Sequence, residues 1–298
     1  MRPAGLQSKI FLDGADPRQT REALSLLGFL DGQTTNPTLL SKNSSVQARL
    51  SRGEKFPKEE IYGLYKQVVR EISGLLPQGS VSIEVYADRT TTALDMLTQG
   101  REMFGWIPNA HIKFPTTKAG LTAAVQAIRE GIRVNMTLVF SQEQAAAVYA
   151  ATLRHGLGQA MLPGLKNVFV SPFVGRLDDR GENGMDLVKN VIEMYQSGDG
   201  HVGVLTASVR SVEQLLYAIQ LGSDCITVPF KVVKAWGEKG FALPEPGFHF
   251  DAGNVKTIPY KEIGLNRDWT VYNITHELTD TGIEKFSADW NSLIYPTQ

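Results

Sequence analysis

The chain has 298 residues, of which 42% are hydrophobic and 20% charged, and its formal net charge is −1. This composition allows a large buried core, and the lack of a dense Lys/Arg tract argues against binding to nucleic acid or to a membrane surface. Because there is one cysteine, Cys225, no signal-peptide pattern and no apolar run of membrane-spanning length, we expect a cytoplasmic protein without internal disulfides.

Short apolar runs alternate with amphipathic segments along the chain. The first run, 9–14, precedes a helix that Asp16 caps, Pro17 begins and Gly28 ends. Eight strand candidates follow from the same reading, at 9–14, 31–37, 81–87, 111–115, 133–140, 167–176, 201–210 and 224–229. Further helices are predicted at 58–76, 116–131, 141–156, 181–195, 211–222 and 275–294. Ser141 with Gln144, and Ser211 with Gln214, have the spacing of capping boxes.

Strands that alternate with helices predict a parallel sheet covered by helices. Eight such units in a chain of this length predict an α/β fold, a single (β/α)8 TIM barrel formed by residues 1–298. A doubly wound open sheet is the rival, and the lack of a glycine-rich dinucleotide motif after the first strand argues against it.

The C-terminal extension 241–298 differs from the rest of the chain. Residues 241–274 are rich in Gly and Pro and weakly periodic, which predicts an irregular segment, and a helix is predicted after it. This extension packs either on the barrel or on a neighbouring subunit, and we expect a homo-oligomer.

Strand alternation brings polar side chains to one face. In 81–86, Val81 and Ile83 take one face while Ser82 and Glu84 take the other. If the apolar faces meet the surrounding helices, the polar set lies inside the barrel. The residues expected there are Asp13, Glu84, Lys113, Asn135, Thr137, Ser171 and Ser208. Most of them lie near the carboxyl ends of strands, where such barrels carry their active sites.

Lys113 lies in the apolar run 111–115, and an enclosed lysine needs a reason. Burial penalises an ammonium, and the neutral amine is the form that attacks a ketone to give a Schiff base. The alternative is a buried ion pair with a structural role only. His111 shares the strand face of Lys113. We expect it to be a hydrogen-bonded core residue, and the other interpretation is a protonated imidazole that favours the neutral lysine.

Several segments resemble the transaldolase family, the Schiff-base-forming (β/α)8 enzymes of the pentose phosphate pathway. The segments are LDGAD, TTNP, HIKFPTTKAGLTAA, GIRVNMTLVFSQEQA, SPFVGRLDD and TASVR, in the expected order over residues 10–236. The resemblance implies a reversible transfer of a dihydroxyacetone unit from a ketose phosphate (sedoheptulose 7-phosphate or fructose 6-phosphate) to an aldose phosphate (glyceraldehyde 3-phosphate or erythrose 4-phosphate). It implies sugar-phosphate partners and no cofactor.

The resemblance also implies a role for each matched residue. Lys113 would form the Schiff base, and Asp13 would take the proton of the substrate hydroxyl as the carbon–carbon bond breaks. Glu84, with a water and Thr137, would move protons as the carbinolamine forms and dehydrates. The substrate-binding residues would be Asn36, Asn135, Ser171 and Phe173 around the three-carbon fragment, and Arg176, Ser208 and Arg210 around the phosphate.

Other functions stay open at this point. Fructose-6-phosphate aldolases release the dihydroxyacetone unit, and they tend to carry Gln and Tyr where this chain has Glu84 and Phe173, so both positions favour the transferase. A barrel isomerase with Glu84 as its base, and a non-catalytic sugar-phosphate-binding barrel, are the alternatives from other classes. His155, His201, His249 and His276 have no metal-ligand spacing, so no metal site is predicted.

Overall fold

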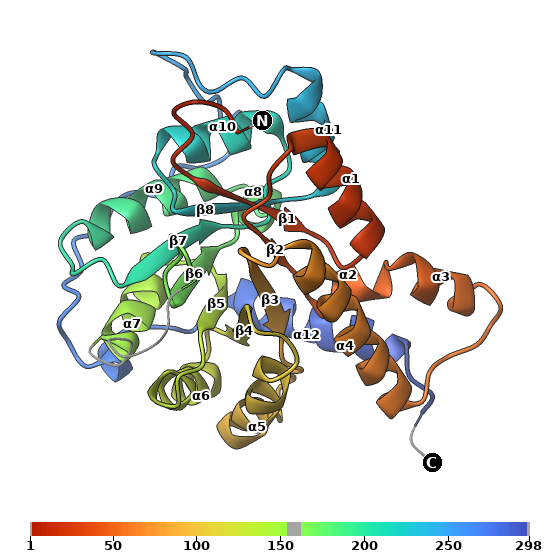
Figure 1. Cartoon of the computed structure of the whole chain (residues 1–298). Helices are drawn as coiled ribbons and strands as arrows, with labels where there is room; N and C mark the ends of the chain where they lie inside the picture. The colour runs from red at the N-terminus through yellow and green to blue at the C-terminus, as the bar shows by residue number, and fades with distance from the viewer. Residues whose placement is uncertain (1, 154–161, 297–298) are drawn as a thin grey trace.

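Eight parallel strands close into a barrel in the computed structural model, which describes residues 2–153 and 162–296. The strands follow one another around the barrel in chain order, and β1 pairs with both β2 and β8 (Figure 1). The predicted (β/α)8 fold is therefore confirmed, and the open doubly wound sheet is excluded.

Each of the eight strands overlaps one of the predicted strand segments. They are β1 Lys9–Asp13, β2 Gly32–Thr34, β3 Ser80–Glu84, β4 Ala110–Pro115, β5 Val134–Val139, β6 Val168–Pro172, β7 Val202–Thr206 and β8 Cys225–Val228. The helices are α1 Pro17–Leu27, α2 Pro37–Ser41, α3 Ser44–Leu50, α4 Lys58–Leu75, α5 Ala93–Phe104, α6 Lys118–Arg129, α7 Gln142–Thr152, α8 Val174–Asp179, α9 Gly184–Tyr195, α10 Val212–Gln220, α11 Phe230–Glu238 and α12 Glu277–Ser292. The last residues of the helix predicted over 141–156 lie outside the described residues, as does His155.

Helix α1 begins and ends as its sequence predicts. The Asp16 side chain accepts a hydrogen bond from the Arg18 amide, Pro17 is the first helical residue, and Gly28 ends the helix with a left-handed backbone at φ 73°. These are the helix signals that local chemistry determines, because each depends on one or two neighbouring residues.

Each of the two predicted capping boxes forms only one of its two reciprocal hydrogen bonds. Ser141 and Ser211 do accept hydrogen bonds from the amides of Gln144 and Gln214. The glutamine side chains do not return to the caps: each accepts from the amide one residue earlier, that of Phe140 at 2.8 Å and of Arg210 at 2.7 Å. The reciprocal box occurs instead at the start of α5, between Thr92 and Asp95.

Neither glutamine side chain turns back to the cap, because its amide nitrogen donates to a residue far away in the sequence. Gln144 Nε2 donates to the Thr279 hydroxyl of α12 at 2.8 Å, and Gln214 Nε2 donates to Asp178 at 2.7 Å. A single side chain satisfies several buried polar groups in this way. The spacing that predicts a capping box thus marks tertiary contacts here.

The predicted sorting of strand faces is confirmed on β4. A Cβ atom at Gly100 of α5 would lie 2.8 Å from the Phe114 ring and 3.3 Å from Ile112. These two apolar residues therefore face outward against α5, and alternation turns His111 and Lys113 toward the barrel interior.

Aromatic side chains fill the barrel interior toward the amino ends of the strands. Phe11, His111 and Phe169 are fully buried. The Phe11 and Phe169 rings meet edge to face at 6.1 Å, and the imidazole stacks on Phe169 at 4.5 Å. We call these three residues the aromatic floor. The polar residues lie on the carboxyl side of it, as expected for a filled barrel of this kind.

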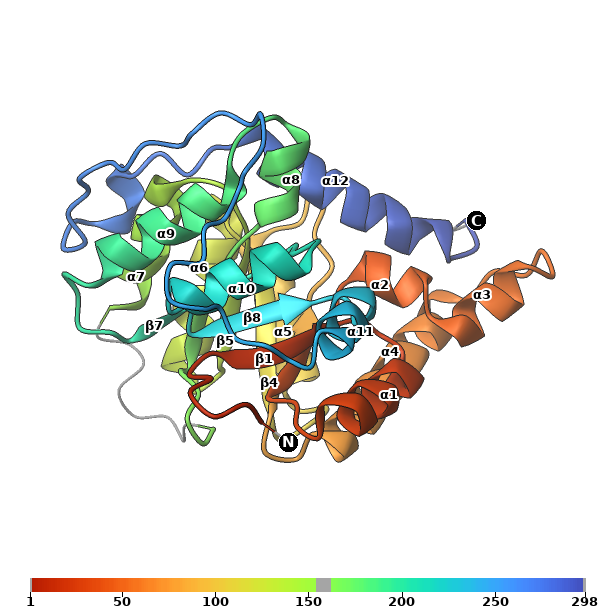
Figure 2. The same cartoon turned by 90° about the horizontal axis from the view of Figure 1, so that it is seen from above.

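The described part of the C-terminal extension 241–298 lies on the outside of the barrel (Figure 2). The stretch 241–274, all of it described, is irregular as predicted except for the 3-10 turn Trp269–Val271. Helix α12 then lies at the end of the barrel away from the N-terminus, beside α8 (Figure 2). It packs against α2 and β5 of its own barrel, and contact with a neighbouring subunit stays a prediction. Among the described residues, none of the helices has both the length and the apolar character needed to cross a membrane.

Candidate active site

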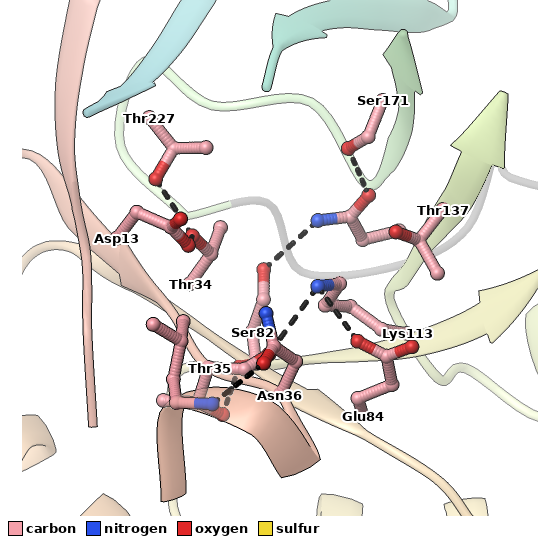
Figure 3. A network of polar contacts seen from close by, with 12 residues as sticks. Asp13, Thr34, Thr35, Asn36, Ser82, Glu84, Lys113, Thr137, Ser171 and Thr227 are labelled. Carbon is pink, nitrogen blue, oxygen red and sulfur yellow. Dashed lines mark hydrogen bonds and ion pairs between the residues drawn. The ribbon is translucent and has the colours of Figure 1, made fainter. Parts of the chain in front are cut away.

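Lys113 and Glu84 form a buried ion pair inside the barrel. They are register partners on β4 and β3, so their side chains leave the sheet side by side. The Lys113 Nζ atom lies 2.8 Å from a Glu84 carboxylate oxygen, and both side chains are only 4% exposed (Figure 3). Such a pair is costly to bury, which makes a purely stabilising role a poor explanation for it.

The backbone around this pair is held by Tyr65 of α4. The Glu84 amide donates to the Tyr65 hydroxyl at 3.1 Å, and the Tyr65 and Thr35 hydroxyls lie 2.6 Å apart. Thr35 Oγ1 donates to the Ser82 carbonyl, so its own proton is used and Tyr65 is the donor to Thr35. The Thr35 carbonyl accepts from Lys113 Nζ at 3.3 Å. Tyr65 was not predicted as a site residue, because it comes from a helix face that reads as core.

Asp13 stands across the site at the end of β1, beside two threonines. Thr34 Oγ1 donates to Asp13 Oδ1 at 2.8 Å, and the Thr34 and Thr227 hydroxyls are 2.6 Å apart. Because the Thr34 proton points to the carboxylate, Thr227 donates to Thr34. Strand alternation places Thr34 and Thr227 on the inner face, but neither was predicted as a site residue.

Burial raises the pKa of both carboxyl groups. For Asp13, Lys113 and the hydrogen bond from Thr34 act in the opposite direction without cancelling the effect of burial. The pKa of Glu84 is raised for the same reason, against the attraction of Lys113. Carboxyl groups whose pKa is shifted toward neutrality can both take up and release protons during a reaction.

The remaining polar residues of the interior form a second cluster. Asn135 Nδ2 donates to Ser82 Oγ at 3.1 Å, and Ser171 Oγ donates to Asn135 Oδ1 at 2.6 Å. The Thr137 hydroxyl is buried and makes no hydrogen bond to the described part of the chain. Leu138, which follows it, has a left-handed backbone at φ 60° where β5 changes register against β6. A strained backbone and an unpartnered buried hydroxyl are typical of functional sites.

A cavity of about 180 Å³ opens beside these groups. Its lining residues come from the carboxyl ends of strands and from the elements after them, and they include Asp13, Asn36, Lys42, Lys113, Ser171, Phe173, Arg176, Ser208, Thr227 and Phe286. Asn36 caps α2 by accepting from the Leu39 amide, and its amide NH2 group makes no hydrogen bond to the described residues. This group is therefore available to a ligand oxygen.

The three residues expected at the phosphate do not lie equally close to the cavity. Arg176, on α8, and Ser208, with a left-handed backbone at φ 58°, both line it. Arg210 is exposed and pairs with Asp179, so it reaches the cavity only if that pair opens. A Cβ atom at Gly175 would lie 2.6 Å from the Ser208 carbonyl, so glycine is required where the first turn of α8 meets the segment after β7.

His111 belongs to the floor and is separate from the reacting groups. Its ring nitrogens contact the Ser80 hydroxyl at 2.8 Å and the Lys166 carbonyl at 3.0 Å. These hydrogen bonds and its complete burial confirm the interpretation as a hydrogen-bonded core residue. Burial lowers the pKa of His111 to about 3, which argues against a protonated imidazole beside Lys113. Among the residues that the structure describes, no three or more His, Cys, Asp or Glu gather as a metal site.

Residues 10–296 match the family model described as Transaldolase/Fructose-6-phosphate aldolase. The chain belongs to this family.

Three relatives of this transaldolase/fructose-6-phosphate aldolase member carry the same name. A "Probable transaldolase" of Dehalococcoides mccartyi is 33% identical over 286 residues, which cover 96% of this chain and 99% of the relative. Another from Roseiflexus sp. is 32% identical, over 95% of this chain and 97% of the relative. A third, from Parabacteroides distasonis, is 36% identical over 76% of this chain and 88% of its own. The resemblance read from the sequence motifs is thus confirmed at the level of the family.

Proposed function

We propose that the protein is a transaldolase, which reversibly transfers a dihydroxyacetone unit between sugar phosphates, the transfer reaction of the pentose phosphate pathway. The observation that carries this proposal is the environment of Lys113. A lysine whose side chain is 4% exposed, 2.8 Å from one carboxylate and at the wall of a cavity that also holds Asp13 is placed for covalent chemistry.

The geometry supports a sequence of proton transfers. Glu84 takes a proton from the Lys113 ammonium, and the neutral amine attacks the ketose carbonyl. Glu84 returns the proton to the carbinolamine hydroxyl, which leaves as water, and the product is the protonated imine. Asp13 then takes the proton of the substrate hydroxyl on the carbon two positions from the imine carbon. The carbon–carbon bond between these two positions breaks, and its electrons stay with the enamine on Lys113. The same steps in reverse join the three-carbon unit to the incoming aldose.

The two carboxyl groups suit different steps because they lie on opposite sides of the site. Glu84 contacts the amine directly, while Asp13, on β1, accepts a hydrogen bond from the Thr34 hydroxyl of β2 (Figure 3). Thr137, whose hydroxyl lacks a partner, is available to hold the water that leaves. Asn36, Asn135 and Ser171 supply donors and acceptors for the hydroxyls of the bound fragment.

The phosphate of the substrate is assigned to Arg176 and Ser208. Both line the cavity, and a guanidinium matches the geometry of phosphate oxygens. Arg210 would join them by exchanging Asp179 for the phosphate. Transfer is favoured over simple aldol cleavage because Glu84 and Phe173, the two residues associated with the transferases, both lie at the site.

Trapping the Schiff base tests the proposal. The protein is incubated with fructose 6-phosphate, reduced with borohydride and digested, and the modified peptide is located by mass spectrometry. We expect a dihydroxyacetone-sized adduct on Lys113, and we expect erythrose 4-phosphate added before reduction to discharge it. Lys42 lines the same cavity and is exposed, so Lys42→Ala is the matched control and should keep the adduct.

The outcomes separate the candidate functions. An adduct that erythrose 4-phosphate does not discharge would indicate an aldolase. A folded Lys113→Ala variant that retains turnover would refute the Schiff base and favour an isomerase. Binding of the sugar phosphates with neither adduct nor turnover would indicate a non-catalytic barrel.

A further inference from the structure

The guanidinium of Arg176 lies between two aromatic rings. Its central carbon is 5.4 Å from the centroid of the Phe173 ring and 5.0 Å from that of the Phe286 ring. Phe173 directly precedes α8, whereas Phe286 comes from α12, more than a hundred residues later in the chain. Both rings are buried and both line the cavity, so the contact with Arg176 occurs at the site itself.

Arg176 forms no ion pair within the described residues. Glu84, Asp179 and Asp289 attract it, Arg210 repels it, and burial lowers its pKa. A half-buried guanidinium without a carboxylate in contact is held here by ring faces. An aromatic ring in a cation–π contact covers the flat face of a guanidinium and leaves the N–H groups at its edge free. Those N–H groups are the part that binds an anion.

The position of Phe286 is determined by contacts along α12. The Thr279 hydroxyl donates to the Leu138 carbonyl at 2.9 Å. A Cβ atom at Gly282 would lie 2.6 Å from Arg176 Nη1 and 2.7 Å from Leu138, so the helix lies directly against both. Near its other end, Asp289 accepts from Thr38 of α2. These contacts attach α12, and with it the Phe286 ring, to β5 and to α2, the helix that follows β2.

We propose that Phe286 is a positioning residue that sets the preference of the site for phosphorylated substrates by orienting Arg176. This inference rests on the proposed function. With the ring in place, the guanidinium of Arg176 stays at the wall of the cavity, where its N–H groups meet the phosphate oxygens without rearranging. Without the ring face, the guanidinium turns toward Glu84, Asp179 or Asp289, and phosphate binding has to compete with that contact.

The test compares Phe286→Leu with Phe286→Tyr. Leucine fills much of the space without a π face, and tyrosine keeps the face. We expect Phe286→Leu to raise the KM for fructose 6-phosphate about tenfold with little change in kcat, because a cation–π contact contributes on the order of a tenfold effect. Phe286→Tyr should restore the wild-type KM. Leu293→Ala, at the end of α12 and fully buried, controls for a general loosening of the helix and should leave the KM unchanged.

Unphosphorylated dihydroxyacetone separates the inference from the proposed function. Its borohydride-trapped adduct on Lys113 does not depend on Arg176, so its yield should be equal in wild type and Phe286→Leu. No adduct in the wild type refutes the Schiff base itself. An adduct in the wild type, with a KM for fructose 6-phosphate that Phe286→Leu leaves unchanged, refutes the role of Phe286.

A parallel loss of the dihydroxyacetone adduct and of fructose 6-phosphate binding would show that Phe286 only supports the fold, and this too would overturn the inference. If Phe286→Leu does not fold, Phe286→Met replaces it, because a flexible thioether side chain fills the same space without a ring. The comparison with Phe286→Tyr is then unchanged.

Discussion

Removing the hydroxyl of Tyr65 tests how the buried lysine is supported. In a continuing parallel ladder, the Glu84 amide and the Thr35 carbonyl would pair with each other. Here the amide donates to Tyr65 at 3.1 Å, and the carbonyl accepts from Lys113 at 3.3 Å. The Tyr65 hydroxyl therefore opens the ladder between β2 and β3, and this opening provides the lysine with a backbone acceptor.

Tyr65→Phe should lower the free energy of unfolding by about 2 kcal/mol. Because Tyr65 is fully buried, no water replaces the removed hydroxyl, and the Glu84 amide loses its hydrogen-bond acceptor. An unsatisfied buried donor costs about 1–3 kcal/mol. The loss of one good donor to Thr35 adds little, because Thr35 Oγ1 keeps its own bond to the Ser82 carbonyl.

Urea unfolding followed by far-UV circular dichroism measures this change. Tyr62→Phe is the matched control, because the Tyr62 ring packs on the same two tryptophans, Trp106 and Trp290, and no hydrogen bond of its hydroxyl to the described residues is present. We expect the control to stay within about 0.5 kcal/mol of wild type. A Tyr65→Phe midpoint as close to wild type as the control, at an equal m value, would refute the opened-ladder account.

Three further variants test the site. Asp13→Asn should raise Tm at pH 7.5, because burial raises the pKa of Asp13 in the folded state. The protonated Asp13 carboxyl contributes fully to stability below the unfolded pKa near 3.8, and this contribution is lost as pH rises through the folded pKa. The gain in Tm should therefore disappear on acidification toward pH 4, and a gain independent of pH would contradict this reasoning. Thr137→Val should stabilise the fold by about 1 kcal/mol in urea unfolding and slow turnover, because it removes an unpartnered buried hydroxyl. Gly282→Ala should cost about 1–3 kcal/mol by the same measurement, since Arg176 and Leu138 must move; a stabilising effect would show that α12 is not seated as described.

The sequence predicts the barrel and the inner polar faces well because both follow from short-range patterns. Alternation along β3 and β4 is sufficient to turn Glu84 and Lys113 inward, and the register of the two strands then brings them into contact. Their contact needs no knowledge of distant segments beyond the fact that consecutive strands are neighbours.

Contacts made by helices were harder to predict. Tyr65 lies on the buried face of α4, where its ring reads as core and its hydroxyl carries no signal in the sequence. Phe286 depends on how α12 crosses the barrel, and that path is determined by Thr279, Gly282 and Asp289 together. Periodicity predicts that a helix is amphipathic, but it does not say which element its apolar face will cover.

The aromatic floor also has a kinetic consequence for the proposed transfer. Phe11, His111 and Phe169 are completely inaccessible, so within the described part of the chain the interior is blocked toward the amino ends of the strands. In the proposed transfer, the donor ketose and the acceptor aldose would therefore both enter from the carboxyl side, where Phe286 of α12 lines the cavity. The first aldose has to depart before the second can bind, and during that interval the three-carbon fragment must not diffuse away. The covalent bond to Lys113 proposed above would retain it without requiring a second pocket.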